Sequence, residues 1–351
     1  MALALAFASA LCLSPFGGSQ FVLAASGPGT VIGWGADNMN QRGVPPYTPH
    51  VIAISAGANH SLALTSAGSV VAWGDDTFGQ TDVPLDLSGV IAISAGANHS
   101  LALKSDGTVV AWGDDSFGQT NVPVSLSGVR EIAAGWHHSL ALRSDGTVVA
   151  WGDDSYGQSD VPADLSGVRA ISAGWYHSLA LTSDGTVVAW GDDSFGQSDV
   201  PSGLSGVVSI SAGLDFSLAL KNDGTVVGWG DNRLFQSSSI PHGLSNVVAI
   251  SAGANHSLAL KSDGTVVSWG SNSKAQTRVP EGLTNVTAIS AGWDFSLAMV
   301  GTTPQYIAAQ SQPQFLFTRE LQWVITGILG LIGLEVLVWY LVVRRRREGV
   351  A

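Results

Sequence analysis

Two residue types in this sequence could do chemistry, because histidines and paired aspartates recur at regular intervals along most of the chain. Histidine is a common general base and metal ligand, and clustered carboxylates can bind calcium. The histidines occupy one repeated position, and the aspartate pairs follow Trp-Gly. They are His60, His99, His138, His177 and His256, with Asp75-Asp76, Asp114-Asp115, Asp153-Asp154 and Asp192-Asp193.

The regular spacing of these residues argues against catalysis and metal binding. Equivalent side chains spread around a repeating fold do not converge on one substrate, and Phe216 and Phe295 take the histidine position in two repeats. The aspartate pairs lack the alternating spacing of a calcium loop, so we expect them to bond their own turns. No nucleophile with a base and acid, zinc-ligand spacing or phosphate-binding glycine loop is evident. We therefore expect a protein that is not an enzyme and uses no metal or cofactor.

The elements that carry these residues form a repeat of 39 or 40 residues. Trp-Gly recurs at this spacing, a glutamine follows seven residues after each tryptophan, and Ala-Gly precedes each Ser-Leu-Ala run. The one extra residue falls in Ser237–Ser239. Such periodicity predicts one domain built from similar units rather than several unrelated domains. The tryptophans are Trp34, Trp73, Trp112, Trp151, Trp190, Trp229 and Trp269.

Each unit has the pattern of β-strands. Short apolar segments such as VIAISAG, SLALKS and TVVAWG are separated by glycine turns, and Asp106-Gly107 is a strong hairpin signal. We also expect a short fourth strand from Gln119 to Pro123. Both faces of these strands are apolar, so each sheet must pack on both sides, as the blades of a propeller do. A solenoid would need polar capping repeats, which are not evident.

The ends of the repeat region predict how the ring closes. Residues 30–35 form a Trp-Gly strand without the two strands before it, and residues 286–300 form two strands without the Trp-Gly strand after them. Together they complete one sheet. We therefore predict an all-β, seven-bladed propeller over residues 30–301, closed by its N-terminal strand. In such a meander the Ala-Gly and Trp-Gly loops share one face and the Asp-Gly hairpins share the other.

The loop after each Ala-Gly differs between units, reading ANH, ANH, WHH, WYH, LDF, ANH and WDF. Residues that vary within a constant frame are candidates for recognition, and aromatic side chains are good interface anchors. The alternative is that the tryptophans fill gaps between blades. The candidate ligand-binding residues are Trp136, His137, Trp175, Tyr176, Asp215, Phe216, Trp293, Asp294 and Phe295, with Phe117, Tyr156, Phe195, Arg233 and Phe235 in adjoining loops.

The charge and the chain ends predict where the propeller works. Residues 1–25 resemble a signal peptide, although no Lys or Arg precedes Arg42, and a buried N-terminal helix is the alternative. Residues 302–322 read as a linker and 323–343 as a transmembrane helix that contains Glu335. The basic tail, 344–351, favours the cytoplasmic side, which places the propeller outside, in the cell envelope. A C-terminal sorting signal leading to the cell surface is the alternative, but it lacks a Pro-Glu-Pro motif.

The partners follow from the same features. The net charge is −12 although Arg344–Arg347 lie in the tail, so the repeats are acidic and poorly suited to nucleic-acid phosphates. The only cysteine, Cys12, lies in the expected signal peptide, so the mature chain would contain no disulfide. We favour a non-enzymatic, membrane-anchored binding module for an extracytoplasmic protein or other macromolecular ligand.

The pattern AGxxHSLALxxDGTVVAWGxxxxGQ resembles the repeat of the regulator of chromosome condensation family over about residues 30–301. This resemblance implies a seven-bladed propeller. The form AWGDDSFGQTNVP is most similar to an exported bacterial branch, the type II β-lactamase-inhibitory proteins, which implies β-lactamase inhibition as an alternative function. Of that branch's aromatic residues at the second loop position, only Tyr176 has a good match. The nuclear branch implies guanine-nucleotide exchange, but repeats this short leave no space for its inserted wedge.

Overall fold

The computed structural model describes residues 17–18, 29–46, 48 and 50–301. These residues lie within one compact unit, Met1–Ala308. In this part of the chain, no helix is long and apolar enough to cross a membrane. The expected linker, transmembrane helix and basic tail lie outside the described residues, as does the expected signal peptide apart from the two-residue strand β1 (Gly17–Gly18).

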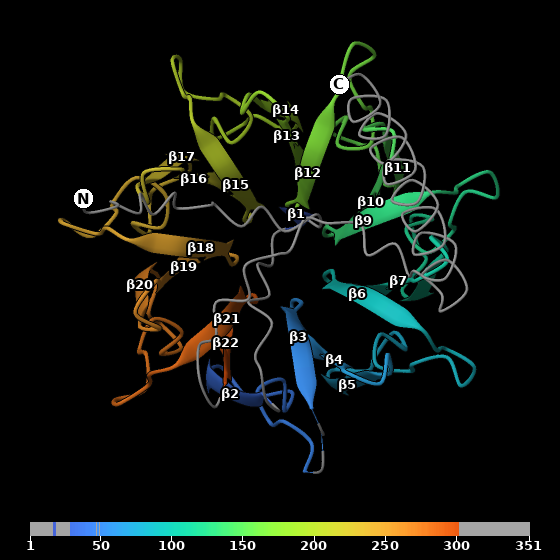
Figure 1. Cartoon of the computed structure of the whole chain (residues 1–351), viewed down its shortest axis with the longest axis horizontal. Coiled ribbons are helices and arrows are strands. Elements are labelled where there is room, and N and C mark those ends of the chain that lie inside the picture. The colour runs from blue at the N-terminus through green and yellow to red at the C-terminus, as the bar shows by residue number, and fades with distance from the viewer. Residues whose placement is uncertain (1–16, 19–28, 47, 49, 302–351) are drawn as a thin grey trace, which may run out of the picture. The chain divides into compact units, whose positions relative to one another are not determined.

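Seven antiparallel sheets of three strands each are arranged around a central axis (Figure 1). β1 adds a short parallel pairing to one of them, beside β12. We number the sheets as blades 1 to 7 in the order of their inner strands. The inner strands are β3 (Val51–Ala56), β6 (Val90–Ala95), β9 (Val129–Ala134), β12 (Val168–Ala173), β15 (Val207–Ala212), β18 (Val247–Ala252) and β21 (Val286–Ala291).

The middle and outer strands continue each blade away from the axis. The middle strands are β4 (His60–Thr65), β7 (His99–Lys104), β10 (His138–Arg143), β13 (His177–Thr182), β16 (Phe216–Lys221), β19 (His256–Lys261) and β22 (Phe295–Val300). The outer strands are β5 (Val70–Gly74), β8 (Val109–Gly113), β11 (Val148–Gly152), β14 (Val187–Gly191), β17 (Val226–Gly230), β20 (Val266–Gly270) and β2 (Thr30–Gly35).

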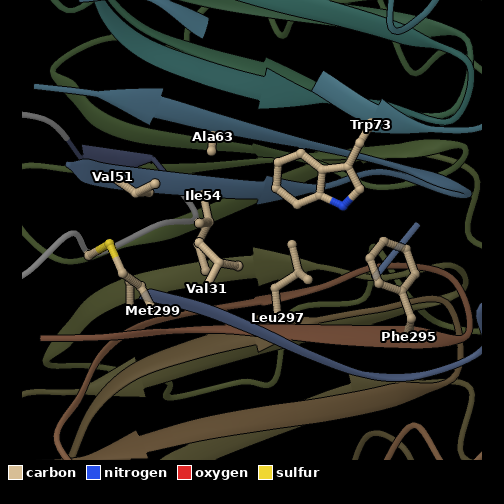
Figure 2. Packing of buried hydrophobic residues seen from close by; sticks show 9 residues of the cluster. Val31, Val51, Ile54, Ala63, Trp73, Phe295, Leu297 and Met299 are labelled. Atoms are coloured by element: carbon tan, nitrogen blue, oxygen red, sulfur yellow. The ribbon is translucent and has the colours of Figure 1, made fainter. Parts of the chain in front are cut away.

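The predicted ring closure is confirmed. β2 pairs antiparallel with β22, from Thr30 opposite Val300 to Gly35 opposite Phe295, and so supplies the outer strand of blade 7. The indole Nε1 of Trp34 donates a hydrogen bond to the carbonyl oxygen of Gln276, in the loop after blade 6, at 2.9 Å. Figure 2 shows the apolar cluster that joins blade 7 to blade 1. The two ends of the repeat region therefore hold the ring shut.

Apolar residues on both faces of each sheet pack between neighbouring blades. In β7, Leu101, Ala102 and Leu103 alternate between the two faces, yet all three are 0% exposed. Leu101 and Leu103 contribute to a cluster with Ile132 and Trp151 of the next blade. This burial explains why the strands read as continuous apolar runs rather than as alternating apolar and polar residues.

The Ala-Gly glycines make a ring of close backbone contacts where the inner strands end. A Cβ atom at Gly57 would lie 2.4 Å from the carbonyl oxygen of Gly96, and one at Gly96 would lie 2.6 Å from that of Gly135. The series returns to its start, since a Cβ at Gly292 would lie 2.7 Å from the carbonyl oxygen of Gly57. Only glycine permits backbones to approach this closely, so the repeated glycine fixes the spacing of the blades.

The predicted fourth strand from Gln119 to Pro123 is wrong, because Gln119 and Thr120 lie in a turn and residues 121–123 have no regular secondary structure. The carbonyl oxygen of Gln119 accepts hydrogen bonds from the Ser139 hydroxyl and from Trp151 Nε1, both in the next blade and both at 2.9 Å. Side chains therefore satisfy this backbone group, where a strand would need a ladder partner. The segment joins neighbouring blades instead of extending one sheet.

Blade 3 departs from the shared pattern of bonds between inner strands. In blade 1 the hydroxyl of Ser55 accepts a hydrogen bond from the Ala95 amide of the next blade at 2.9 Å, but blade 3 has Ala133 at the serine position. There, Oε1 of Glu131 accepts a bond from the Ile171 amide of blade 4 at 2.9 Å. Burial raises the pKa of Glu131 well above its usual value. A carboxyl thus links these two blades, although it bonds a different amide of the neighbouring inner strand than the serine hydroxyl does elsewhere.

Candidate binding site at the channel mouth

The repeated histidines are structural, as their regular spacing predicted. His138 Nε2 lies 2.9 Å from the hydroxyl oxygen of Ser178 in the next blade, and that hydroxyl donates to the carbonyl oxygen of Gln158. Because the serine proton is already used, the histidine donates from Nε2 and must carry its proton there. Burial lowers the pKa of His138 to about 3, so the ring is neutral. The same histidine-to-serine bond joins four other pairs of blades.

The aspartate pairs bond their own turns, as the sequence predicted. Oδ1 of Asp114 accepts bonds from the Ser116 amide and hydroxyl, while Oδ2 accepts one from the Gln119 side-chain amide at 3.1 Å. Asp115 accepts a bond from the Thr120 amide at 3.0 Å. These contacts fold the loop that follows each outer strand. Within the described residues, no group of carboxylates, histidines and cysteines has the arrangement of a metal site.

Phe216 and Phe295 must be removed from the candidate binding residues. Both side chains are 0% exposed, so neither can contact a ligand in this structure. They occupy the place of the repeated histidine at the start of a middle strand, and a Cβ at Gly213 would lie 2.3 Å from the Phe216 ring. Sequence variation misled the prediction here, because phenylalanine replaces histidine as a packing residue.

Three of the predicted residues meet at the mouth of the central channel. The ring centroids of Trp136 and Trp175 lie 3.6 Å apart with an interplanar angle of 36°. Trp293 approaches both nearly at right angles, with centroid distances of 5.3 Å to Trp136 and 5.1 Å to Trp175. All three side chains are partly exposed. We call these residues the Trp triad, and the contacts show that they meet over the channel instead of filling gaps between blades.

Position in the ring explains why residues so distant in sequence meet. Each triad residue directly follows an Ala-Gly glycine, where an inner strand ends. Trp136 and Trp175 come from adjacent blades 3 and 4, while Trp293 comes from blade 7 on the opposite side. The other blades place smaller side chains at this position, so three indoles can reach the axis without collision. Those side chains are Ala58, Ala97, Leu214 and Ala254.

A cavity of about 80 Å³ lies at this mouth, lined by the Ala-Gly residues of the blades and by the Trp triad. Its small wall residues follow from the glycine ring, which brings the inner strands together at this end. This volume is larger than the roughly 15 Å³ that one water molecule needs. The mouth therefore has room for a small side-chain group.

Further aromatic residues lie on the same face as the triad, which we call the loop face. Each Trp-Gly loop of blades 1 to 4 presents one exposed aromatic ring at the same position, about half exposed in every case. Sequence analysis missed one of them, and its constant place two residues after the aspartate pair was the available signal. These residues, which we call the loop aromatics, are Phe78, Phe117, Tyr156 and Phe195.

Two predicted residues connect the triad to the loop aromatics. His137 lies 4.4 Å from Phe117 and 5.6 Å from Trp136, measured between ring centroids. Tyr176 lies 4.8 Å from Tyr156 and 6.3 Å from Trp175. The contacts form a continuous aromatic surface from the axis outward over blades 2 to 4. Burial lowers the pKa of His137, although Asp114 opposes the effect, so this ring is neutral near pH 7.

The remaining predicted residues, Asp215 and Asp294, are half-buried carboxylates at the second loop position. Burial raises the pKa of Asp215 to about 6, with further increases from the nearby charges of Asp231 and Asp192. Burial also raises the pKa of Asp294, against the effect of Lys274. Both groups therefore hold negative charge that their surroundings compensate poorly.

Six stretches of the chain match the profile of the regulator of chromosome condensation (RCC1) repeat, at residues 51–80, 90–119, 129–158, 168–197, 207–236 and 247–276. Together they cover just over half of the sequence. The chain belongs to the RCC1 repeat family. The unit that forms blade 7 is absent from these stretches, which agrees with its division between the two ends of the repeat region.

Solved structures share this RCC1-type propeller. Prp20p from Saccharomyces cerevisiae is 22% identical, with a TM-score of 0.68 over 80% of this chain and 93% of that chain. Human WBSCR16 is 20% identical, with a TM-score of 0.65 over 78% and 99%. The ectodomain of the Arabidopsis thaliana receptor kinase ACR4 is 22% identical, with a TM-score of 0.59 over 72% and 94%. A search of curated proteins gave no significant match. Likeness at this level of identity establishes the fold alone.

Proposed function

We propose that this RCC1-repeat propeller is a non-enzymatic binding module for a protein or other macromolecular ligand, and that the loop face is its binding surface. The observation that supports the proposal is the gathering of the Trp triad at the mouth, with the exposed loop aromatics on the same face. Large, stiff aromatic side chains bury much area at little cost in conformational entropy, and they dominate many interfaces. On the opposite face, the hairpins of blades 2 to 6 have hydrophilic Asp-Gly turns.

The RCC1-type fold is compatible with this proposal. The crystal structure of Prp20p is described together with its binding to Gsp1p and histones, so a propeller of similar fold binds proteins. The acidic loops here favour partners other than nucleic acids, whose phosphates need basic residues. We further propose that the chain is exported and held in the cell envelope by residues 323–343, with the propeller outside, or processed to the cell surface.

A capture experiment with loop-face variants tests the function. The full-length protein would be immobilised and exposed to extracts of its native surroundings, and captured proteins would be quantified by mass spectrometry. We expect a partner to be captured by the wild type and lost from the variant with Trp136→Ala, Trp175→Ala and Trp293→Ala. A hairpin-face control with Asp145→Asn and Asp184→Asn should retain it. Equal capture by all three proteins, with the fold intact by circular dichroism, would contradict the proposal.

β-Lactamase inhibition is a second candidate, based on the AWGDDSFGQTNVP form and on the exposed aromatic residues of the loop face. The aromatic residue Tyr176 at the second loop position is the feature that favours it most. Inhibition assays against a panel of β-lactamases would decide this alternative, and no inhibition at micromolar concentrations would exclude it. Guanine-nucleotide exchange is a weaker candidate because the repeats contain no inserted wedge, and a nucleotide-release assay would test it.

A further inference from the structure

The loop that follows the outer strand of blade 5 departs from the pattern of its neighbours. Blades 1 to 4 have an aromatic residue and then a glycine before the repeated glutamine, whereas blade 5 has Leu234 and Phe235. This unit also contains the one extra residue of the repeat region, in Ser237–Ser239. Leu234 is 45% exposed, much as the loop aromatics are, but Phe235 is 67% exposed. Phe235 thus adds a second large apolar side chain to this loop.

The backbone of Phe235 has a conformation that favours glycine. Its φ angle is 63°, and the glycines at the same position in blades 1 to 4 have φ angles between 75° and 79°. The turn itself is unchanged, since the amide of Phe235 donates to the carbonyl oxygen of Asn232 at 3.0 Å, as that of Gly79 does to Asp76 at 3.1 Å. In this left-handed region a Cβ atom crowds the following carbonyl oxygen. Phe235 therefore carries backbone strain that glycine would remove.

Packing within the propeller does not compensate for this strain. A Cβ atom added at Gly157 or Gly196, which occupy the same position in blades 3 and 4, would have no heavy atom within 4 Å. Among the described residues, Phe235 belongs to none of the buried apolar clusters. Backbone strain that folding does not require is a feature of functional sites.

Hydrogen bonds hold the backbone of this loop in place. Oδ1 of Asn232 accepts bonds from the amides of Ser237 and Ser238, at 3.2 Å and 3.1 Å. The amide of Leu234 donates to Oε1 of the buried Gln236 at 2.9 Å. Because the loop is ordered before a partner arrives, little conformational entropy is lost when its side chains bind.

The blade 5 loop has also lost the acidic character of its neighbours. Blades 1 to 4 carry two aspartates after Trp-Gly, but blade 5 has Asn232 in the second place. Its remaining carboxylate, Asp231, pairs with Arg233, whose Nε donates to it at 2.8 Å. The guanidinium of Arg233 lies 4.3 Å from the centre of the Phe195 ring. The loop therefore carries no net charge of its own, and Arg233 joins it to a loop aromatic of blade 4.

We propose, resting on the binding function above, that Phe235 is an anchor of the loop face and enters an apolar recess on the surface of a folded protein partner. Leu234 would cover the edge of that recess. Neutral acceptors of the partner, such as main-chain carbonyl oxygens, would bind the Nη groups of Arg233, which have no hydrogen-bond partner among the described residues. Aromatic side chains that fill a pocket in the partner dominate the energy of many interfaces.

Charge decides for a neutral recess on a protein over three other partners. A basic surface would gain little at this loop, because the one carboxylate of the loop is already paired with Arg233. An anionic lipid surface would be repelled by the paired aspartates of blades 1 to 4 on the same face. A second copy of this chain would bring two such acidic faces together, and like charges across an interface are unfavourable.

The test places a photoreactive benzoylphenylalanine at position 235 of the full-length protein. The protein would be illuminated in extracts of its native surroundings, and the crosslinked residues would be identified by mass spectrometry. We expect crosslinks to one partner protein, at apolar residues that line a recess. The same photoreactive group at Val124, an apolar residue that is 106% exposed between blades 2 and 3, controls for exposure as such.

Matched glycine variants separate binding from folding. Phe235→Gly restores the residue of blades 1 to 4, so its urea midpoint should equal or exceed that of the wild type. Its capture of the crosslinked protein should nevertheless fall at least about tenfold. Ala275→Gly is the control, because Ala275 has a φ angle of 64° at the same position in blade 6. This variant relieves similar strain without removing a large side chain, so capture should change by less than about twofold.

Several results would overturn the inference. They are crosslinks from position 235 no stronger than those from position 124, crosslinks only to lipid or to a second copy, and unchanged capture by Phe235→Gly. A lower urea midpoint for Phe235→Gly would also overturn it, because the side chain would then serve the fold. If capture still required the Trp triad, these results would leave the binding function intact and remove only the anchor. If capture did not depend on the triad, the binding function itself would fail.

Discussion

The five buried histidines should make this propeller sensitive to acid, and His138→Phe tests the point directly. His138 is fully buried, donates to Ser178, and has its pKa lowered from 6.5 to about 3 by burial. The native state therefore excludes a proton that the unfolded chain binds below about pH 6.5. Blades 5 and 7 already contain phenylalanine here, with Phe216 and Phe295 fully buried, so the substitution suits the fold.

The magnitude and its sign follow from this depressed pKa. The stability that His138 contributes is complete above about pH 6.5 and falls as the pH drops towards the native pKa, by about 1.4 kcal/mol per pH unit. At about pH 5 the loss is about 2 kcal/mol for this one residue. Phenylalanine does not titrate, but it gives up the bond to Ser178, which is worth about 1 kcal/mol. The variant should thus be less stable than the wild type at about pH 8 and more stable at about pH 5.

Urea unfolding followed by tryptophan fluorescence at both pH values would measure this reversal. Comparison with the wild type cancels the other titrating groups, and the two stability curves should cross near about pH 6. His242→Phe, at an exposed site, controls for the loss of an imidazole as such. A constant difference between His138→Phe and the wild type across this range would refute the reasoning, because it would mean that the native state protonates His138 as easily as the unfolded chain does.

Two further predictions follow from particular bonds. Trp151→Phe removes the Nε1 bond to Gln119 and should cost about 1 kcal/mol more than Trp269→Phe in urea unfolding, because the buried Nε1 of Trp269 has no partner in the described structure. Glu131→Ala with Ala133→Ser removes a buried carboxyl whose raised pKa costs stability as the pH rises, and it restores the serine found in other blades, so at about pH 8 it should unfold at higher urea than the wild type. Glu131→Ala alone leaves the link between blades 3 and 4 unreplaced, so it should unfold at lower urea than the double variant. The difference between the double variant and the wild type should shrink at low pH, where the carboxyl is protonated in both the folded and the unfolded state.

Much of the fold was predictable because a repeat presents the same evidence several times. The constant spacing of Trp-Gly and Ala-Gly showed the number of blades, and the incomplete units at residues 30–35 and 286–300 showed how the ring closes. The absence of a fourth strand was not predictable from the local sequence pattern. The carbonyl oxygen of Gln119 is satisfied by side chains of the next blade, and such long-range contacts leave no local signal in the sequence.

The site was predictable only in part for a similar reason. Variation between repeats correctly drew attention to Trp136, Trp175 and Trp293, but it could not show that one indole reaches the other two across the axis. It also grouped Phe216 with exposed residues, since position in a loop sequence does not show which side chain turns inward. The compensation of Ala133 by Glu131 needed the register of two blades to be seen.

The geometry of a closed ring explains why the seven repeats cannot all carry a large residue at the channel mouth. Residues that follow the Ala-Gly glycines converge on the axis, where seven indoles could not fit beside one another. Bulky residues at this position are therefore possible in only some blades, and every such choice breaks the symmetry of the mouth. Trp136, Trp175 and Trp293 fill this space, while the other blades place Ala58, Ala97, Leu214 and Ala254 at the same position. The mouth is therefore asymmetric, although the units that form it are nearly identical.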